Sequence, residues 1–158
     1  MRPATAADLP ALVALLADDP LGRGRERAAD LAPYRAAFDR IDGDPAHLLV
    51  VAADGDDVVG TLQLSVLPGL SRAGALRGQV EGVRVHARHR GAGLGGALVR
   101  CAVEESRRQG CALVQLTSDR TRADAHRFYE RLGFAHTHAG YKLELPRQGS
   151  GGSPTLGP

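Results

Sequence analysis

The stretch from Val83 to Leu98 constrains the fold more than any other part of the chain. It opens with Val83 and Val85 alternating with polar residues, which is the period of a strand that buries one face. A basic, glycine-rich turn follows, and from Gly93 the apolar residues recur at helical spacing. This order predicts a strand that runs through a glycine turn into the N-terminus of a helix.

The junction between that turn and that helix is suited to binding an anion. The first N–H groups of a helix have no partner within the helix, and the helix dipole adds partial positive charge there. Glycines let an oxyanion approach the backbone because no Cβ stands in the way. The turn lacks the Lys and Ser/Thr of a P-loop, and its spacing, Gly91-x-Gly93-x-Gly95, is not that of the dinucleotide fingerprint. The alternative is a glycine-rich turn without a ligand.

Composition narrows the class of protein. The 158 residues suffice for one domain with a buried core, and a net charge of +2 does not favour a nucleic-acid partner. Both cysteines, Cys101 and Cys111, lie in apolar contexts, which favours reduced core residues in a cytoplasmic protein. No apolar run approaches the roughly 18 residues of a membrane span, and the N-terminus has no signal-peptide pattern, so no membrane partner is expected.

Hydrophobic periodicity predicts an alternation of strands and helices along the whole chain. Strands are expected at residues 2–4, 47–53, 57–67, 75–86, 111–117, 134–137 and 141–145. Helices are expected at residues 5–16, 25–41, 93–109 and 121–132. The order is β-α-α-β-β-β-α-β-α-β-β, with hairpins first and a strand-helix-strand crossover later.

This order predicts an α/β (mixed α+β) fold with a mostly antiparallel central sheet of about six or seven strands, flanked by about four helices. We expect one domain over residues 1–146. Residues 147–158 are rich in Gly, Ser and Pro, and we expect a disordered tail there.

Two motifs in this chain resemble those of the GNAT superfamily of N-acetyltransferases, in particular its bacterial members. The sequence R-x-x-G-x-G starting at Arg90 is similar to the acyl-CoA pyrophosphate loop of that family. The sequence A-x-x-F-Y-x-x-x-G-F starting at Ala125 is similar to a second family signature. The resemblance extends over almost the whole chain, and it implies a GNAT-like fold.

The resemblance implies acetyl-CoA as co-substrate, without a metal. The pantetheine arm would lie along a strand, the pyrophosphate would lie in the glycine turn, and arginines would neutralise the phosphates. One departure is Arg122, which stands where many relatives carry Asn. For Arg88 and Arg90 the alternative is a solvated loop position. The residues implied in cofactor binding are Val83, Arg84, Val85, Arg88, Arg90, Gly91, Ala92, Gly93, Leu94, Gly95, Gly96, Arg122 and Phe128.

Tyr129 and Glu81 are the candidate catalytic residues. The resemblance places Tyr129 near the sulfur of CoA, where a phenol with a pKa near 10 can act as general acid toward the leaving thiolate. Glu81 is expected to share a strand face with Val83 and Val85, where partial desolvation would suit a base that deprotonates the amine. The alternatives are a tyrosine that only packs in the core and a glutamate that is salt-bridged or exposed.

The predicted activity is direct transfer of an acetyl group from acetyl-CoA to a primary amine within one ternary complex. The acceptor would be a small molecule or a peptide, bound between the first two helices, the loop at residues 68–74 and the final hairpin. The alternative from another class is a non-catalytic acyl-CoA-binding regulatory module. A homodimer is plausible for the family. His136 and His138 could share one strand face, but no acidic or Cys partner accompanies them, so no metal site is expected.

Overall fold

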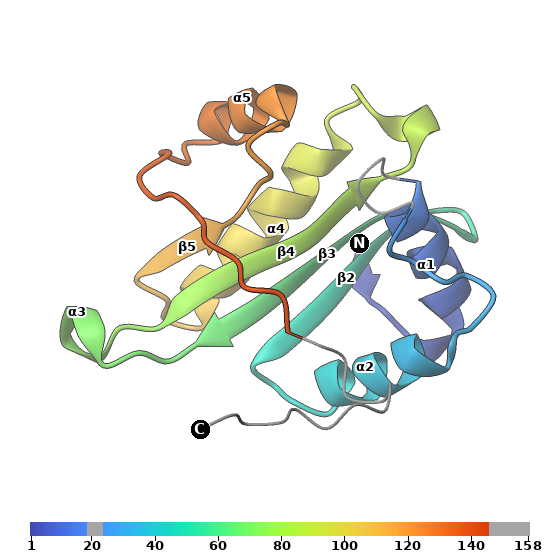
Figure 1. Cartoon of the computed structure of the whole chain (residues 1–158), viewed down its shortest axis with the longest axis horizontal. Helices are drawn as coiled ribbons and strands as arrows, with labels where there is room; N and C mark the ends of the chain where they lie inside the picture. The colour runs from blue at the N-terminus through green and yellow to red at the C-terminus, as the bar shows by residue number, and fades with distance from the viewer. Residues whose placement is uncertain (19–23, 146–158) are drawn as a thin grey trace, which may run out of the picture.

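A computed structural model describes residues 1–18 and 24–145 as a five-stranded sheet with helices on both faces (Figure 1). The strands follow chain order: β1 (Arg2–Pro3), β2 (His47–Asp54), β3 (Asp57–Leu67), β4 (Arg77–Val85) and β5 (Leu113–Leu116). Neighbouring strands are antiparallel except β4 and β5, which are parallel. The predicted mixed α/β fold is confirmed, with fewer strands than expected.

Four helices of nine residues or more lie in the described part of the chain: α1 (Leu9–Ala17), α2 (Ala32–Asp42), α4 (Leu94–Arg108) and α5 (Ala123–Arg131). Shorter elements are η1 (Ala6–Asp8), η2 (Ala87–His89) and α3 (Ser71–Gly74), a turn whose Arg72 and Ala73 have left-handed backbone angles. The second helix is shorter than predicted, since residues 24–31 are not helical. It begins at Ala32, so that Pro33 lies in its first turn, where proline is tolerated. Within the described ranges, no helix is both long and apolar enough to cross a bilayer.

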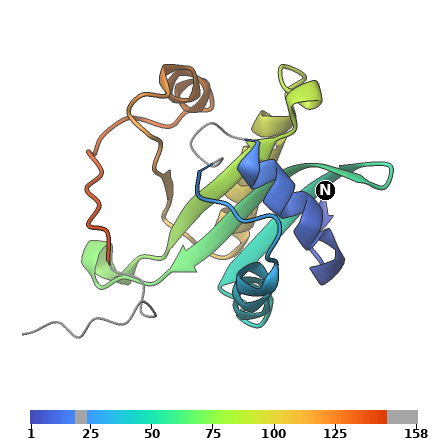
Figure 2. The same ribbon diagram turned by 45° about the vertical axis from the view of Figure 1, so that its right-hand side comes forward.

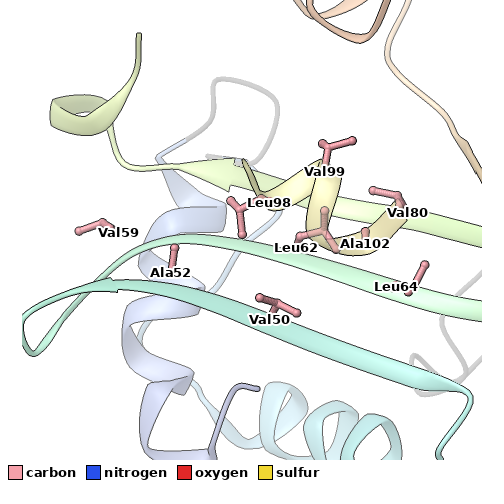
Figure 3. Close-up of a cluster of buried hydrophobic side chains, with 9 residues drawn as sticks. All are labelled: Val50, Ala52, Val59, Leu62, Leu64, Val80, Leu98, Val99 and Ala102. Carbon is pink, nitrogen blue, oxygen red and sulfur yellow. The ribbon is translucent and has the colours of Figure 1, made fainter. Parts of the chain in front are cut away.

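Two hydrophobic clusters lie on opposite faces of the sheet. Figure 3 shows the larger one, in which side chains of β2, β3 and β4 meet Leu98, Val99 and Ala102 of α4. The second packs Leu9, Leu12 and neighbouring residues of α1 and α2 against Val51 of β2. Figures 1 and 2 together show α1 and α2 on one face and α4 on the other, so the sheet is enclosed as an α/β sandwich on both sides.

The prediction of two final strands, at residues 134–137 and 141–145, is wrong. Residues 135–145 form no regular structure, and Tyr141, Leu143 and Leu145 are 95%, 87% and 79% exposed. Their alternation is strand-like, but a strand also needs a hydrogen-bonding neighbour, which the period of the side chains does not supply. The predicted tail at residues 147–158 lies outside the described residues.

The N-terminal strand is fixed to the first helix by a buried carboxylate. Asp8, 7% exposed, accepts hydrogen bonds from both terminal nitrogens of Arg2 at 2.7 Å and from the backbone N–H and hydroxyl of Thr5 at 2.7 and 3.0 Å. The Arg2 guanidinium, followed by the Thr5 donors, holds the pKa of Asp8 well below its usual range, against the opposing effect of burial. The folded state therefore favours the ionised form.

Asp8→Asn is expected to lower the free energy of unfolding by about 2 kcal/mol at pH 7, because charge-assisted hydrogen bonds are lost from a buried site. The depressed pKa means that this stabilisation is present above the unfolded-state pKa, near 4, and is lost as pH falls through the folded-state value. Urea unfolding at pH 7 and pH 3 measures the difference in free energy of unfolding between wild type and Asp8→Asn. This difference should be smaller at pH 3. The exposed Asp39→Asn is the control. Equal stability of Asp8→Asn and wild type at pH 7 would contradict this assignment.

Candidate active site

The site is built where β4 separates from β5. The two strands pair only over Arg77–Val80 and Leu113–Leu116, so β4 continues from Glu81 to Val85 beyond its last residue pair with β5. The glycine turn and α4 follow the end of β4, and α5 lies beyond the end of β5 (Figure 1). The predicted strand, turn and helix at residues 83–98 therefore meet at this gap in the sheet.

The open edge of β4 presents backbone groups to the gap. The N–H of His86 bonds to the carbonyl of Val59 on β3, so by alternation Arg84 also points its backbone toward β3, while Val83 and Val85 point theirs outward. Arginine side chains contact both outward carbonyls. Arg84 Nη1 donates to Val83 O at 2.9 Å, and Arg90 Nε donates to Val85 O at 2.9 Å. An extended ligand could pair with this edge in the manner of an added strand.

The glycines of the turn have two different structural roles. Gly91 and Gly93 have φ of +81° and +83°, and a Cβ on either would meet nothing within 4 Å, so the turn is left-handed and has open space beside it. Gly95 has close neighbours instead, because a Cβ there would be in ordinary van der Waals contact with Phe128 at 3.4 Å and with Val85 at 3.7 Å. At this residue the first turn of α4 lies against both β4 and α5. Gly93 is the N-cap of α4, so the first N–H groups of that helix lie directly after the open turn.

Tyr129 lies on α5 beside this gap. Its ring packs edge-to-face with Phe128 and Phe134, at centroid distances of 5.0 and 6.0 Å, against the larger hydrophobic cluster. Burial raises the pKa of the Tyr129 phenol, and the positive charges of Arg122 and then Arg84 oppose the rise. The phenol therefore carries its proton at neutral pH, as a general acid must.

Glu81 does not share a face with Val83 and Val85, and that prediction is wrong. Glu81 lies opposite Gln63 and Arg84 lies opposite Thr61, so Gly82 and Val83 together face the single residue Leu62. This β-bulge, with Gly82 at a φ of +61°, shifts the alternation by one residue.

The bulge moves Glu81 to the face covered by α1 and α2. Its cross-strand row continues through Gln63 to Leu49, which packs in the α1/α2 cluster, whereas Val83 and Val85 pack toward α4. The side chain of Glu81 is exposed rather than partly desolvated. Glu81 and Tyr129 thus approach the gap from opposite sides of the sheet.

The remaining predicted residues surround the turn. Arg88 and Arg90 are exposed in the loop, and Arg90 also bonds to Asp18 at the end of α1. Ala92 is exposed, while Leu94 is half-buried and Gly96 is buried in α4. Arg122 is the N-cap residue of α5, close enough for its charge to act on Tyr129.

Sequence reasoning missed two features of this site. Gly82 inside a strand pattern is a recognised signal of a bulge. The contact of Asp18 with Arg90 spans 72 positions and has no local signal.

The thiols and histidines add no further reactive cluster. Cys101 and Cys111 are half-buried and free, and burial raises the pKa of the Cys111 thiol, which disfavours its nucleophilic thiolate form. Among residues 1–18 and 24–145, no three His, Cys, Asp or Glu side chains are grouped as a metal site would need.

The chain belongs to the acetyltransferase (GNAT) family, whose pattern matches residues 9–134. It is 39% identical over 88 residues to a glucosamine 6-phosphate N-acetyltransferase of Trypanosoma brucei brucei, covering 56% of this chain and 58% of that protein. It is 32% identical over 109 residues to an aminoalkylphosphonate N-acetyltransferase of Salmonella typhimurium, covering 69% of this chain and 70% of that protein. The expectation of a GNAT acyltransferase is thereby confirmed at the level of the family.

A solved structure extends the likeness over the whole fold. The crystal structure of a protein from Bacillus halodurans C-125, described as a transcriptional regulator, shares 45% identity with a TM-score of 0.89. The match covers 91% of this chain and 97% of the Bacillus halodurans chain. A glucosamine-6-phosphate N-acetyltransferase of Arabidopsis thaliana, at 18% identity and a TM-score of 0.77, shares the fold alone, with 92% and 97% of the two chains covered.

Proposed function

We propose that this protein is an acetyl-CoA-dependent N-acetyltransferase that transfers the acetyl group directly to a primary amine in a ternary complex. The observation that carries the proposal is the gap between β4 and β5, which opens beside a left-handed glycine turn, a helix N-terminus and a protonated, half-buried tyrosine. The strand edge suits an extended carrier arm, the anion site suits its phosphates, and the general acid suits the thiolate that leaves during acetyl transfer.

Acetyl-CoA would bind with its pantetheine arm along the outer edge of β4 at Val83, Arg84 and Val85. The pyrophosphate would lie over the turn and first residues of α4, from Gly91 to Gly96, where the N–H groups and the helix dipole favour an anion. Arg88 and Arg90 supply charge for the phosphates from the loop. Arg122 and Phe128 complete the cofactor site from the side of α5.

Within this complex the acceptor amine would reach the thioester carbonyl from the α1/α2 face. Glu81, which faces that side, would take a proton from the amine directly or through a water molecule, and the neutral nitrogen would attack the carbonyl carbon. Collapse of the tetrahedral intermediate breaks the C–S bond, and Tyr129 would protonate the departing sulfur. The excess proton on the positively charged nitrogen would then pass to the resulting phenolate, which restores the phenol and leaves a neutral amide. The products are an amide and CoA with a free thiol, and no enzyme nucleophile is needed.

The two curated relatives are named for acceptors that combine an amine with a phosphate or phosphonate. We therefore propose a small amine that carries a phosphorus oxyanion as the first acceptor class, with peptide N-termini as the comparison. Release of free thiol from acetyl-CoA measures the reaction. An amine-dependent rate supports the proposal, and CoA binding with no thiol release from any amine would contradict it.

That contrary result would favour the second candidate, an acyl-CoA-binding regulatory module without catalysis. The observation in its favour is the description of the Bacillus halodurans protein as a transcriptional regulator. Such a module needs the glycine turn and the edge of β4, but it needs neither a general acid nor a base. Thiol release therefore separates the two candidates.

Glu81→Gln is expected to lower kcat by about a hundredfold, because the amine would lose its base while the strand geometry stays unchanged. Affinity for CoA should remain within about twofold, since Glu81 faces away from α4. Steady-state kinetics by thiol release check this, with the exposed Glu130→Gln of α5 as control. A kcat equal to that of wild type would remove Glu81 from the mechanism.

We also propose that two copies associate through the C-terminal segment. Tyr141, Leu143 and Leu145 alternate and are exposed, and β5 is the last strand of the sheet order, so its outer edge can accept a strand. Sedimentation of the full chain tests this, and a monomer at micromolar concentration would contradict it.

A further inference from the structure

Arg90 makes two contacts that hold its guanidinium at the entrance of the glycine turn. Its Nε donates to the carbonyl of Val85 at 2.9 Å, and its Nη2 donates to Asp18 Oδ2 at 3.1 Å. The Arg90 and Asp18 side chains are 54% and 44% exposed, so both are accessible to a ligand that enters the turn. The guanidinium of Arg90, which would bind the phosphates of CoA, is thus already paired with the carboxylate of Asp18.

The carboxylate and a phosphate compete for this guanidinium. A phosphate that binds Arg90 would also lie close to Asp18, and the two negative charges would repel each other. Phosphate groups carry more charge than one carboxylate and pair well with arginine. The pyrophosphate can therefore displace Asp18, but part of its binding free energy is used in doing so.

Asp18 also lies at an electrostatically unfavourable position of α1. It is the C-cap residue, its N–H bonds to the carbonyl of Ala14 at 3.0 Å, and the last turn of α1 holds no basic residue. A negative side chain at the C-terminal end of a helix is disfavoured by the helix dipole. Arg90 compensates this charge from outside the helix, so removal of Arg90 should loosen the last turn.

We propose that Asp18 is a positioning residue that holds Arg90 at the entrance of the glycine turn and is displaced when CoA binds. The displacement couples the phosphate site to the end of α1, on the face where the acceptor amine enters. CoA binding then loosens the last turn of α1 before the acceptor binds. This inference rests on the proposed function, because it takes CoA as the ligand of the turn.

The test is isothermal titration of CoA into wild type, Asp18→Asn, Arg90→Gln and the double variant. Asp18→Asn is expected to tighten CoA binding about threefold to fivefold. This is the size of effect expected when an exposed ion pair no longer has to be broken for the ligand to bind. The same substitution should have a clearly smaller effect in the Arg90→Gln background, because the competition for the guanidinium acts through Arg90. Glu104→Gln is the matched control, since it breaks an exposed carboxylate–arginine pair further along α4 with the same change in charge.

Hydrogen exchange provides a readout that affinity alone does not give. In wild type, CoA should increase amide exchange at residues 15–18, and in Asp18→Asn it should not. If wild type binds no CoA, the proposed function and this inference both fail. If wild type binds CoA but Asp18→Asn binds it equally or more weakly, only this inference is overturned. Equal tightening in the Arg90→Gln background, or no exchange response in wild type, would also overturn it.

Discussion

Replacing Tyr129 by phenylalanine is expected to lower kcat by about a hundredfold to a thousandfold while CoA affinity stays within about twofold. The phenol is the general acid for the departing thiolate in the proposed reaction, so its loss affects the chemical step. Burial raises the pKa of Tyr129 over the opposing charges of Arg122 and Arg84, which keeps the proton on oxygen. Any loss of activity from ionisation of this phenol should therefore occur above pH 10.

The phenylalanine ring should preserve the packing of the site. Tyr129 contacts Phe128 and Phe134 through ring edges, and these contacts do not involve its hydroxyl. A stability loss is thus not the expected cause of a lower rate. Tyr34→Phe is the control, because the Tyr34 hydroxyl bonds to Glu26 and to the Arg27 N–H away from the gap. An unchanged kcat for Tyr129→Phe at saturating substrates would limit Tyr129 to a packing role.

Adding one methyl group at Gly78 is expected to have the largest effect on stability, about 3 kcal/mol. A Cβ on this buried residue of β4 would lie 2.4 Å from Ser106 Oγ and 3.1 Å from Ser106 Cβ, on α4. Ser106 is 1% exposed, so neither side chain can turn into solvent. Either α4 must move away from the sheet or the strand must distort. Urea unfolding of Gly78→Ala measures the loss.

The contact can be relieved from the other side. Ser106 Oγ donates to the Ala102 carbonyl of its own helix, so Ser106→Ala removes the nearer of the two clashing atoms at small cost. The double variant Gly78→Ala/Ser106→Ala should recover most of the lost stability, which would identify the clash as the cause. Wild-type stability of Gly78→Ala would show that α4 does not need its close approach to β4.

Local signals predicted the parts of the site that depend on local geometry. Gly91 and Gly93 lie in the predicted glycine turn, and α4 begins directly after it, where helical spacing begins in the sequence. The helix predicted over residues 121–132 likewise corresponds to α5, which carries Tyr129. These features depend on a few consecutive residues, whose steric preferences do not require the rest of the fold.

Features set by pairing between distant segments could not be predicted in this way. The face of Glu81 depends on a register shift against β3, and one extra residue at Gly82 reverses the alternation. The final strands failed because alternation at Tyr141 and Leu143 says nothing about a neighbouring strand. The pair of Asp18 with Arg90 joins two segments that only the folded sheet brings together.

The central claim, that acetyl-CoA binds at the turn from Gly91 to Gly96, is tested most directly by titrating CoA into wild type, Gly93→Glu and Gly110→Glu. Gly93 and Gly110 flank α4, have similar φ of +83° and +77°, and have open space around the missing Cβ, so the two substitutions carry the same strain and charge. Wild type and Gly110→Glu should bind with micromolar Kd, and Gly93→Glu should show no binding. Equal binding by the two variants, or none by wild type, would contradict the claim.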